Sequence, residues 1–276
     1  MDARVQRRVQ RYGWDRAADD YESLWQAQLA PARDALFACA ALHEGESVLD
    51  VACGTGLVAM RAADAVGRAG RVVGVDLSGR MVQAAAQAAA ARGLRQATFT
   101  RMDAEALTFP DASFDVVFCA LGLMYVPDPR QALREMARVL RPRGRLLLAV
   151  WGPRSRCGFG SVFGIVQAEV ASDVCPLFFG LGEDDNLVRE CASAALEVDR
   201  RFTVATTLRY PHADQACNAA FVGGPVALAW SRFDDDTRAR VCLRYLDSIG
   251  EWRDGSGYAL PAEFVVVEAA VRPAAG

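Results

Sequence analysis

The feature that most constrains this chain is an apolar run that breaks at two glycines one residue apart. Residues 48–51 read VLDV, which indicates a short buried strand, and Gly54 and Gly56 follow before a helical apolar pattern begins. Glycine permits a sharp turn and the close approach of a ligand, while the first helical turn offers unpaired N–H groups. The pattern predicts a strand–turn–helix unit that binds the polar part of a nucleotide-like cofactor.

Two aspartates indicate which cofactor this turn would bind. Asp76 lies twenty residues beyond Gly56, at the end of a second apolar run, and this spacing suits a carboxylate that accepts hydrogen bonds from ribose hydroxyls. The glycines also satisfy the loose dinucleotide fingerprint, so a nicotinamide-dependent oxidoreductase is one alternative. Asp50 would repel a pyrophosphate but favour a cofactor that carries a cationic ammonium and sulfonium. The other interpretation of Asp50 is that it braces the loop or caps the helix.

Six ordered segments between residues 44 and 151 resemble the class I S-adenosylmethionine-dependent methyltransferases, in the branch that includes the quinone-biosynthesis C-methyltransferases. The segments span residues 49–56, 74–81, 103–109, 114–117, 126–129 and 135–144. The resemblance implies an α/β fold with a doubly wound, Rossmann-like sheet of seven strands, mostly parallel with one antiparallel strand. It also implies S-adenosyl-L-methionine as the cofactor. Arg143 departs from the pattern, because the family usually has a second glycine there.

The same resemblance assigns residues to the cofactor site. Asp103 and Ala104 would bind the adenine ring, Met81 would pack on it, and Tyr21 would reach the methionine moiety. For Met81 and Tyr21, packing in the core is the alternative. The complete cofactor-binding set is Tyr21, Asp50, Ala52, Cys53, Gly54, Gly56, Asp76, Leu77, Met81, Asp103, Ala104, Cys119 and Ala120.

The chain is expected to form a single methyltransferase domain over residues 1–276, in three parts. Helices in residues 1–42 would form an N-terminal lid, and alternating strands and helices in residues 43–151 would form the cofactor-binding core. Residues 152–276 would hold a cap insertion and the last two strands, near 198–210 and 264–267. Phenylalanines of the cap are candidates for an apolar substrate wall or for the core of the cap itself, namely Phe159, Phe163, Phe178 and Phe179.

Composition excludes several other classes of protein. Hydrophobic residues make up 52% of the 276 residues, which favours a sizeable core over disorder. No apolar run is long enough for a membrane span, and the polar N-terminal residues argue against a signal peptide. A net charge of −3 without a long basic run argues against a nucleic-acid partner. We therefore expect a cytoplasmic protein, a monomer or homodimer, with a small-molecule methyl acceptor as its partner.

The predicted chemistry is methyl transfer by direct displacement to a small, rather apolar acceptor at oxygen, nitrogen or carbon. A general base is needed only if the acceptor is protonated. His212 is the better of the two histidines for that role, with a structural role as its alternative, and Tyr125 would either face the substrate or pack. A protein that keeps the cofactor fold without turnover is a further alternative.

A metal or metalloid site has little support in the sequence. The eight cysteines form no C-x-x-C pair, so structural zinc is not expected and the thiols should be reduced. Cys157, Cys175 and Cys217 could converge on arsenite, but their spacing matches no motif. The sequence therefore predicts no metal.

Overall fold

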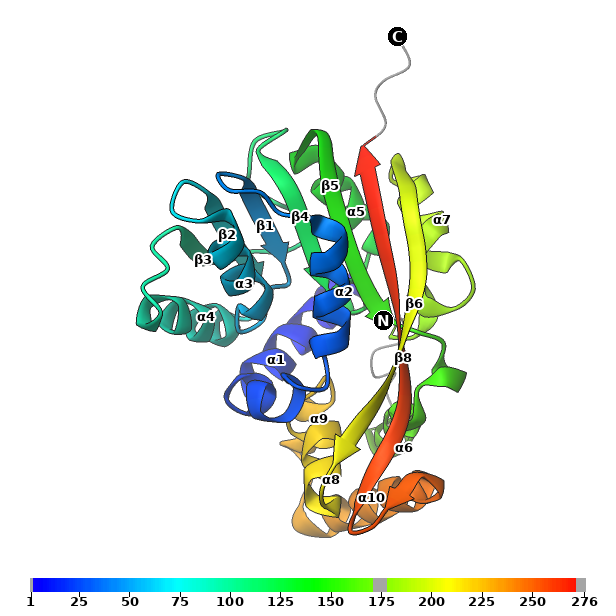
Figure 1. Cartoon of the computed structure of the whole chain (residues 1–276). Helices are drawn as coiled ribbons and strands as arrows, with labels where there is room; N and C mark the ends of the chain where they lie inside the picture. The colour runs from blue at the N-terminus through cyan, green and yellow to red at the C-terminus, as the bar shows by residue number, and fades with distance from the viewer. Residues whose placement is uncertain (1, 171–177, 272–276) are drawn as a thin grey trace.

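One mixed sheet organises the molecule, and the computed structural model describes residues 2–170 and 178–271 (Figure 1). Its order is β3-β2-β1-β4-β5-β8-β6, with β7 paired to β8. The strands are β1 (Ser47–Val51), β2 (Arg71–Asp76), β3 (Ala97–Arg101), β4 (Phe114–Ala120), β5 (Leu140–Trp151), β6 (Leu196–Tyr210), β7 (Arg253–Asp254) and β8 (Gly257–Val271). Strands β1 to β5 are parallel, and β8 runs antiparallel to β5 and β6. The predicted sheet class is confirmed, with the two-residue β7 as an eighth strand.

Helices cover both faces of the sheet (Figure 1). On one face lie α2 (Ala30–Ala40), α3 (Leu57–Val66) and α4 (Gly79–Ala91), and on the other lie α5 (Pro129–Val139) and α7 (Asn186–Ser193). Ser78 is the N-cap of α4, where its Oγ accepts from the Met81 N–H, and Asp128 is the N-cap of α5, whose first residue is a proline. Strands β1, β2, β4 and β5 are mostly apolar and buried on both faces, whereas β3 lies at the edge of the sheet and has no buried residue.

A smaller helical region surrounds an extension of the sheet. Strand β5 pairs with β8 only over residues 264–269, so the remainder of β8 continues with β6 as a two-stranded ribbon. Helices α6 (Ser161–Val170), α8 (Ala213–Phe221), α9 (Ala227–Trp230) and α10 (Asp235–Ser248) gather around this ribbon (Figure 1). The short 3-10 helices are η1 (Leu123–Tyr125), η2 (Arg154–Arg156), η3 (Gly158–Gly160), η4 (Gly180–Gly182) and η5 (Gly250–Trp252). We refer to α6, α8, α9, α10 and the ribbon as the cap.

Two strands are longer than the sequence predicts. Strand β8 spans fifteen residues, whereas only residues 264–267 were expected, because Pro261 and Glu263 interrupt the apolar pattern along the ribbon. The sequence RPRG at residues 141–144 predicts a turn, yet strand β5 already begins at Leu140. Arg143 adopts φ of 67°, a left-handed conformation that glycine adopts at lower cost. The irregular start of β5 therefore fits the family's usual glycine better than it fits arginine.

Helix α1 (Ala3–Trp25) lies between the sheet and the cap (Figure 1). It packs against α4 on one side and against α8 and α9 on the other. Within residues 2–170 and 178–271, no helix has the length and apolar character that crossing a bilayer requires. Because of this placement, α1 contacts both the sheet core and the cap and borders the space between them.

Candidate functional site

Three adjoining cavities lie at the carboxyl ends of β1, β2 and β4, beneath α1. Their volumes are about 770, 480 and 390 Å³, and we call them the first, second and third cavity in that order. Tyr21 and Leu121 line all three, so the cavities meet where these two side chains lie. Ligands of open α/β sheets bind at this end of the strands, and the position therefore marks the candidate site.

The glycine turn after β1 adopts the geometry that its residues predict. Gly54 and Gly56 have φ of 53° and 86°, and a Cβ on Gly56 would lie 2.9 Å from the Cβ of Ala85. The Gly54 N–H donates to Asp76 Oδ2 at 2.9 Å. Asp76 also accepts from the Ser78 N–H at 2.8 Å, and burial raises its pKa. The carboxylate thus fixes the turn while it lines the first cavity.

Asp50 combines both roles that the sequence left open. Its side chain is 1% exposed and lines the third cavity, while Oδ2 accepts from the Ala59 N–H at 3.0 Å near the start of α3. Burial raises the pKa of Asp50 to about 8, and the nearby Asp76 carboxylate adds to this rise. The acid is mostly protonated at neutral pH, and a cation entering the cavity would favour its ionised form.

Sequence reasoning missed two polar residues of the third cavity, Arg33 and Thr55. Burial lowers the pKa of the Arg33 guanidinium, which donates to the Gln26 carbonyl at 2.8 Å. The Thr55 hydroxyl is buried without a hydrogen-bond partner in the structure. With Asp50, these groups provide an acid for an ammonium, and a cation and a hydroxyl for a carboxylate. These three groups therefore fit the amino and carboxylate groups of S-adenosylmethionine, and that carboxylate would give the Thr55 hydroxyl a hydrogen-bond partner.

The first cavity gathers most of the predicted cofactor residues. It is lined by Tyr21, Ala52, Gly54, Asp76, Leu77, Met81, Asp103, Ala104, Ala120 and Tyr125. Asp103 follows β3, where its Oδ1 accepts from the Glu105 N–H at 3.0 Å and its Oδ2 lies 3.0 Å from Arg7 Nε. Asp76 and Asp103 thus place two acidic side chains in the lining of the same cavity.

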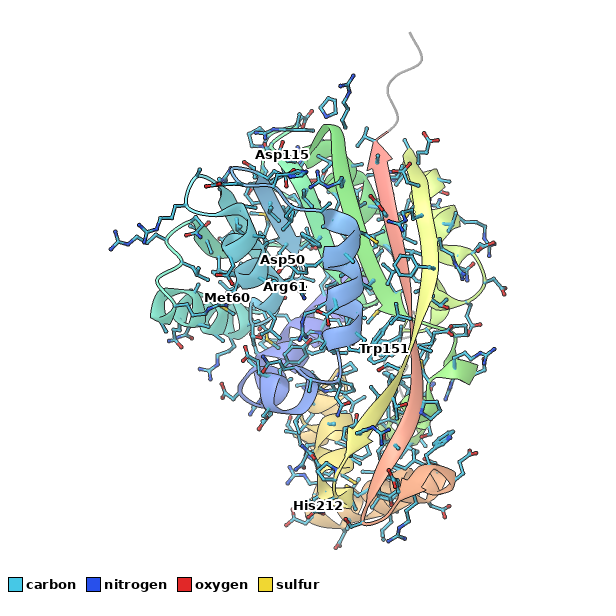
Figure 2. All side chains as sticks on the ribbon, in the orientation of Figure 1. Asp50, Met60, Arg61, Asp115, Trp151 and His212 are labelled. Atoms are coloured by element: carbon cyan, nitrogen blue, oxygen red, sulfur yellow. The ribbon has the colours of Figure 1, made fainter. Side chains whose placement is uncertain are left out.

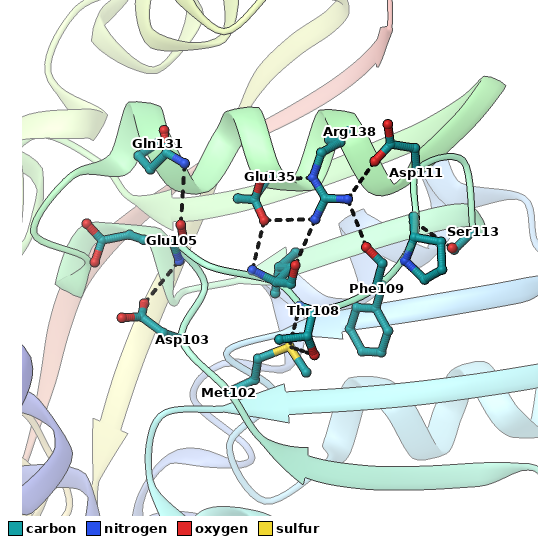
Figure 3. Close-up of polar contacts among 12 residues, drawn as sticks. Met102, Asp103, Glu105, Thr108, Phe109, Asp111, Ser113, Gln131, Glu135 and Arg138 are labelled. Atoms are coloured by element: carbon teal, nitrogen blue, oxygen red, sulfur yellow. Dashed lines mark hydrogen bonds and ion pairs between the residues drawn. The ribbon is translucent and has the colours of Figure 1, made fainter.

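The loop that carries Asp103 is anchored to α5 (Figure 3). Glu135 accepts from the Leu107 N–H at 2.8 Å, and Arg138 donates to the carbonyls of Leu107 and Phe109 at 2.7 and 2.8 Å. The pKa of the Arg138 guanidinium is raised by its hydrogen bonds to Glu135 and Asp111. These bonds hold the loop in place without help from a ligand.

Several polar contacts hold helix α1 over the first cavity, and two of them are hydrogen bonds between part-buried side chains. Near the start of α1, Arg7 Nε donates to Glu105 at 2.6 Å, which raises the pKa of the guanidinium. Further along, Asp15 accepts from the Ser78 Oγ–H at 2.6 Å. The latches at Arg7 and Asp15 place Tyr21, on the same helix, at the junction of the cavities. We use "latches" for these two contacts below.

The second cavity has an aromatic lining. The predicted residues Phe159, Phe163 and Phe178 contribute to it, whereas Phe179 packs behind them. Three tryptophans that sequence reasoning did not identify also line this cavity, namely Trp14 and Trp25 on α1 and Trp151 on β5. Tyr125 also lines this cavity, with its ring centroid 5.6 Å from that of Phe178.

Three predicted site residues lie outside the linings of these cavities. Gly56 begins α3, Cys119 is buried within β4, and His212 is exposed at the start of α8. Figure 2 shows His212 at the far end of the cap from Asp50. The scarcity of histidine made His212 a candidate, but its position offers no contact with the cavities.

The cysteines suggested for arsenite are dispersed as far as the structure describes them. Cys157 is buried, and its thiol lies 3.9 Å from the Gly152 carbonyl, while a hydrogen bond to Cys242 raises the pKa of Cys217. Cys175 lies outside the described residues. Across 2–170 and 178–271, histidine, cysteine and acidic side chains form no cluster of three that could hold a metal ion.

Comparison with known proteins agrees with this geometry. A family model described as a methyltransferase domain matches residues 48–144. Residues 48–144 are therefore similar in sequence to a methyltransferase domain. The C-methyltransferase UbiE of ubiquinone and menaquinone biosynthesis from Hahella chejuensis is 46% identical over 108 residues, which cover 39% of this chain and 43% of that protein. The predicted resemblance to the quinone-biosynthesis branch of the class I methyltransferases is confirmed.

The relatives differ in how much of this chain they match. Six quinone methyltransferases are matched over only 43–52% of their length. The nocamycin O-methyltransferase of Saccharothrix syringae is 28% identical over 277 aligned residues, covering 95% of this chain and 99% of that protein. The solved [4+2]-cyclase SpnF has a TM-score of 0.59 at 22% identity, over 87% of this chain and 80% of its own. The match at this low identity shows a shared fold.

Proposed function

We propose that this chain is an S-adenosylmethionine-dependent methyltransferase that acts on a small, rather apolar acceptor. The junction of the three cavities at Tyr21 and Leu121 supports this proposal most directly. The first and third cavities suit the two ends of the cofactor, and the second cavity is aromatic. A group at the junction would contact all three spaces, which is where a transferable methyl group must lie.

The residues present fit the cofactor. Asp76 would accept from the ribose hydroxyls, and Asp103 and Ala104 would contact the adenine, with Met81 packed against it. Asp50, Arg33 and Thr55 would hold the amino-acid end in the third cavity. Ala52, Cys53, Leu77 and Ala120 would complete the walls.

The bound cofactor supplies an electrophilic methyl group on a sulfonium. The chain itself orients the two reactants and excludes water, since α1 and the aromatic lining enclose the junction. Leu121 adopts φ of 60°, and a Cβ on Gly122 would lie 2.3 Å from the Cβ of Ala52. This close packing fixes the strand end that faces the junction.

The proposed reaction does not rely on a base from the second cavity. Its described lining contains no histidine and no charged side chain. Burial raises the pKa of Tyr21 to about 12, so this phenol stays protonated at neutral pH. Tyr125 lines both the first and second cavities and is our candidate for contact with the acceptor. His212 gains no support as a base from its position.

We further propose the setting of this reaction. The acceptor is a small molecule and not a nucleic acid, consistent with the net charge of −3, and the protein works in the cytoplasm as a monomer or homodimer. The division into a lid at 1–42, a core at 43–151 and a cap region at 152–276 belongs to the same proposal. Light scattering after size exclusion measures the oligomeric state.

Isothermal titration with S-adenosylmethionine tests the cofactor assignment, with reduced nicotinamide cofactor as the comparison. We expect a dissociation constant in the micromolar range, about −8 kcal/mol, for S-adenosylmethionine alone. Asp76→Ala provides the control. Binding of the nicotinamide cofactor in place of S-adenosylmethionine would contradict the proposal.

A second candidate function is cofactor binding without methyl transfer. The solved structure of SpnF motivates this candidate. SpnF has a similar fold but is named a [4+2]-cyclase, so the fold alone does not imply methyl transfer. Transfer of a labelled methyl group from the cofactor to an added acceptor distinguishes the two. Tight cofactor binding with no transfer to any member of a broad acceptor panel would favour the second candidate.

A further inference from the structure

The indole N–H of Trp25 is a buried donor without a partner. Trp25 ends α1, its side chain is 7% exposed, and its Nε1 makes no hydrogen bond in the structure. Buried N–H groups are normally paired, because an unpaired one loses its bonds to water without compensation. The group therefore requires an explanation.

The surroundings of this N–H connect it to the second cavity. Trp25 lines that cavity together with Gly223 and Gly224, and a Cβ placed on Gly224 would lie 4.0 Å from Trp25 Nε1. Gly224 has no side chain to cover the indole edge, although a Cβ there would also lie 3.4 Å from the Ala219 carbonyl oxygen. A ligand atom that packs against the backbone of Gly224 would lie next to the donor.

The rest of the lining defines what kind of molecule can enter. Aromatic rings supply much of the wall, and ring pairs such as Trp151–Phe159 lie 4.8 Å apart between centroids. The described lining carries no charged side chain. A charged ligand would lose its hydration without a counter-charge, whereas a flat neutral one would stack on the rings.

We propose that Trp25 is a specificity-determining residue whose indole N–H donates to an oxygen of the methyl acceptor. The acceptor class is a neutral aromatic or conjugated ring system that bears a carbonyl or hydroxyl oxygen. This inference rests on the proposed function, because it takes the second cavity as the acceptor site.

The position of Trp25 relative to the junction sets the size of that acceptor. Tyr21 lies at the junction, one helical turn before Trp25 on α1. Four residues of α-helix rise about 6 Å, which is the scale of one to two fused rings. A two-ring acceptor whose oxygen meets Trp25 therefore extends to the place where the methyl group would lie.

The test compares 1-tetralone with tetralin, which have the same two rings with and without a carbonyl. Both are titrated into the protein saturated with S-adenosylhomocysteine. The wild type should bind tetralone about tenfold more tightly than tetralin, the effect of one hydrogen bond. In Trp25→Phe this preference should vanish while tetralin affinity stays nearly constant.

Two further variants separate the hydrogen bond from general packing. Gly224→Ala keeps the indole and places a methyl group beside Nε1, so it should reduce the tetralone preference. Trp252→Phe removes an indole that does not line the cavity and should leave the preference unchanged. In addition, the indole N–H signal of Trp25, assigned from its absence in Trp25→Phe, should move downfield with tetralone but not with tetralin.

The outcomes distinguish this inference from the proposed function. Equal affinities for tetralone and tetralin in the wild type, or an unchanged preference in Trp25→Phe, would overturn the role of Trp25. Cofactor titration on the same samples reports on the proposed function separately. Wild-type protein that binds no S-adenosylmethionine would defeat the proposed function and this inference with it.

Discussion

The cofactor half and the acceptor half of the site are built by opposite means. The first and third cavities depend on backbone turns, buried carboxylates and an arginine at the ends of parallel strands. The second cavity depends on aromatic side chains from α1, from β5 and from the cap. A turn with a fixed backbone binds one cofactor well, whereas a wall of side chains changes its shape with single substitutions. The difference explains how one fold can serve many acceptors.

The largest effect is expected from the carboxylate that fixes the glycine turn. Asp76→Ala removes the acceptor for the Gly54 and Ser78 N–H groups and the proposed partner of the ribose. Loss of charge-assisted hydrogen bonds should weaken S-adenosylmethionine binding about a hundredfold or more. Titration calorimetry measures this, with circular dichroism to verify folding. If Asp76→Ala bound S-adenosylmethionine as tightly as the wild type does, the assignment of the first cavity as the cofactor site would be wrong.

A substitution in the aromatic wall should affect stability and the acceptor, but not the cofactor. Phe163 is 7% exposed, with its ring centroid 4.4 Å from that of Phe178. Phe163→Ala should lower the free energy of unfolding by about 3 kcal/mol, because it leaves a cavity. Urea denaturation measures this change. Cofactor affinity should stay within about twofold, and a larger loss would show that the two halves are not independent.

Arg33→Ala should weaken S-adenosylmethionine about thirtyfold through loss of one charge-assisted contact to the cofactor carboxylate. Decarboxylated S-adenosylmethionine, which lacks that group, should bind the wild type and the variant equally. Arg8→Ala is the matched control, since Arg8 is exposed on α1 and lines none of the three cavities. An equal loss for both ligands would assign Arg33 a structural role instead.

The smallest predicted effect is a pH dependence from Asp50. Its pKa of about 8 means that the free site is mostly protonated at pH 6 to 7. An incoming ammonium favours the carboxylate, so binding releases a proton and affinity rises with pH by at most about tenfold per unit. Above pH 8 this dependence should end.

Calorimetry in buffers of different ionisation enthalpy measures the released proton directly. Asp50→Asn has no carboxyl proton to lose at this position. The variant should therefore release only the protons that come from the cofactor itself. Identical proton release in the wild type and in Asp50→Asn would show that Asp50 does not ionise when the cofactor's ammonium binds.

The cofactor half was predictable from sequence because its signals are local. The glycines, Asp50 and Asp76 lie within thirty residues, and strand–helix alternation implies a parallel sheet. Asp103 and Tyr21 required the family resemblance, since no spacing rule connects them with the turn. Arg33 was missed because its spacing does not distinguish it from the other arginines of this chain.

The acceptor half was less predictable because segments far apart in sequence build it. Trp25, Trp151 and Phe163 meet only after α1 and the cap fold against the sheet. An apolar aromatic in a sequence looks the same whether it lines a cavity or fills a core. For the same reason the choice of His212 relied on the rarity of histidine, which carries no information about position.

Helix α1 supplies walls to all three cavities and is held by the latches at Arg7 and Asp15. Because α1 is one continuous helix, we expect a movement of α1 that uncovers one ligand to uncover the other. The residence times of the spent cofactor and the methylated product should therefore be coupled, so a variant that weakens either latch should release both of them faster.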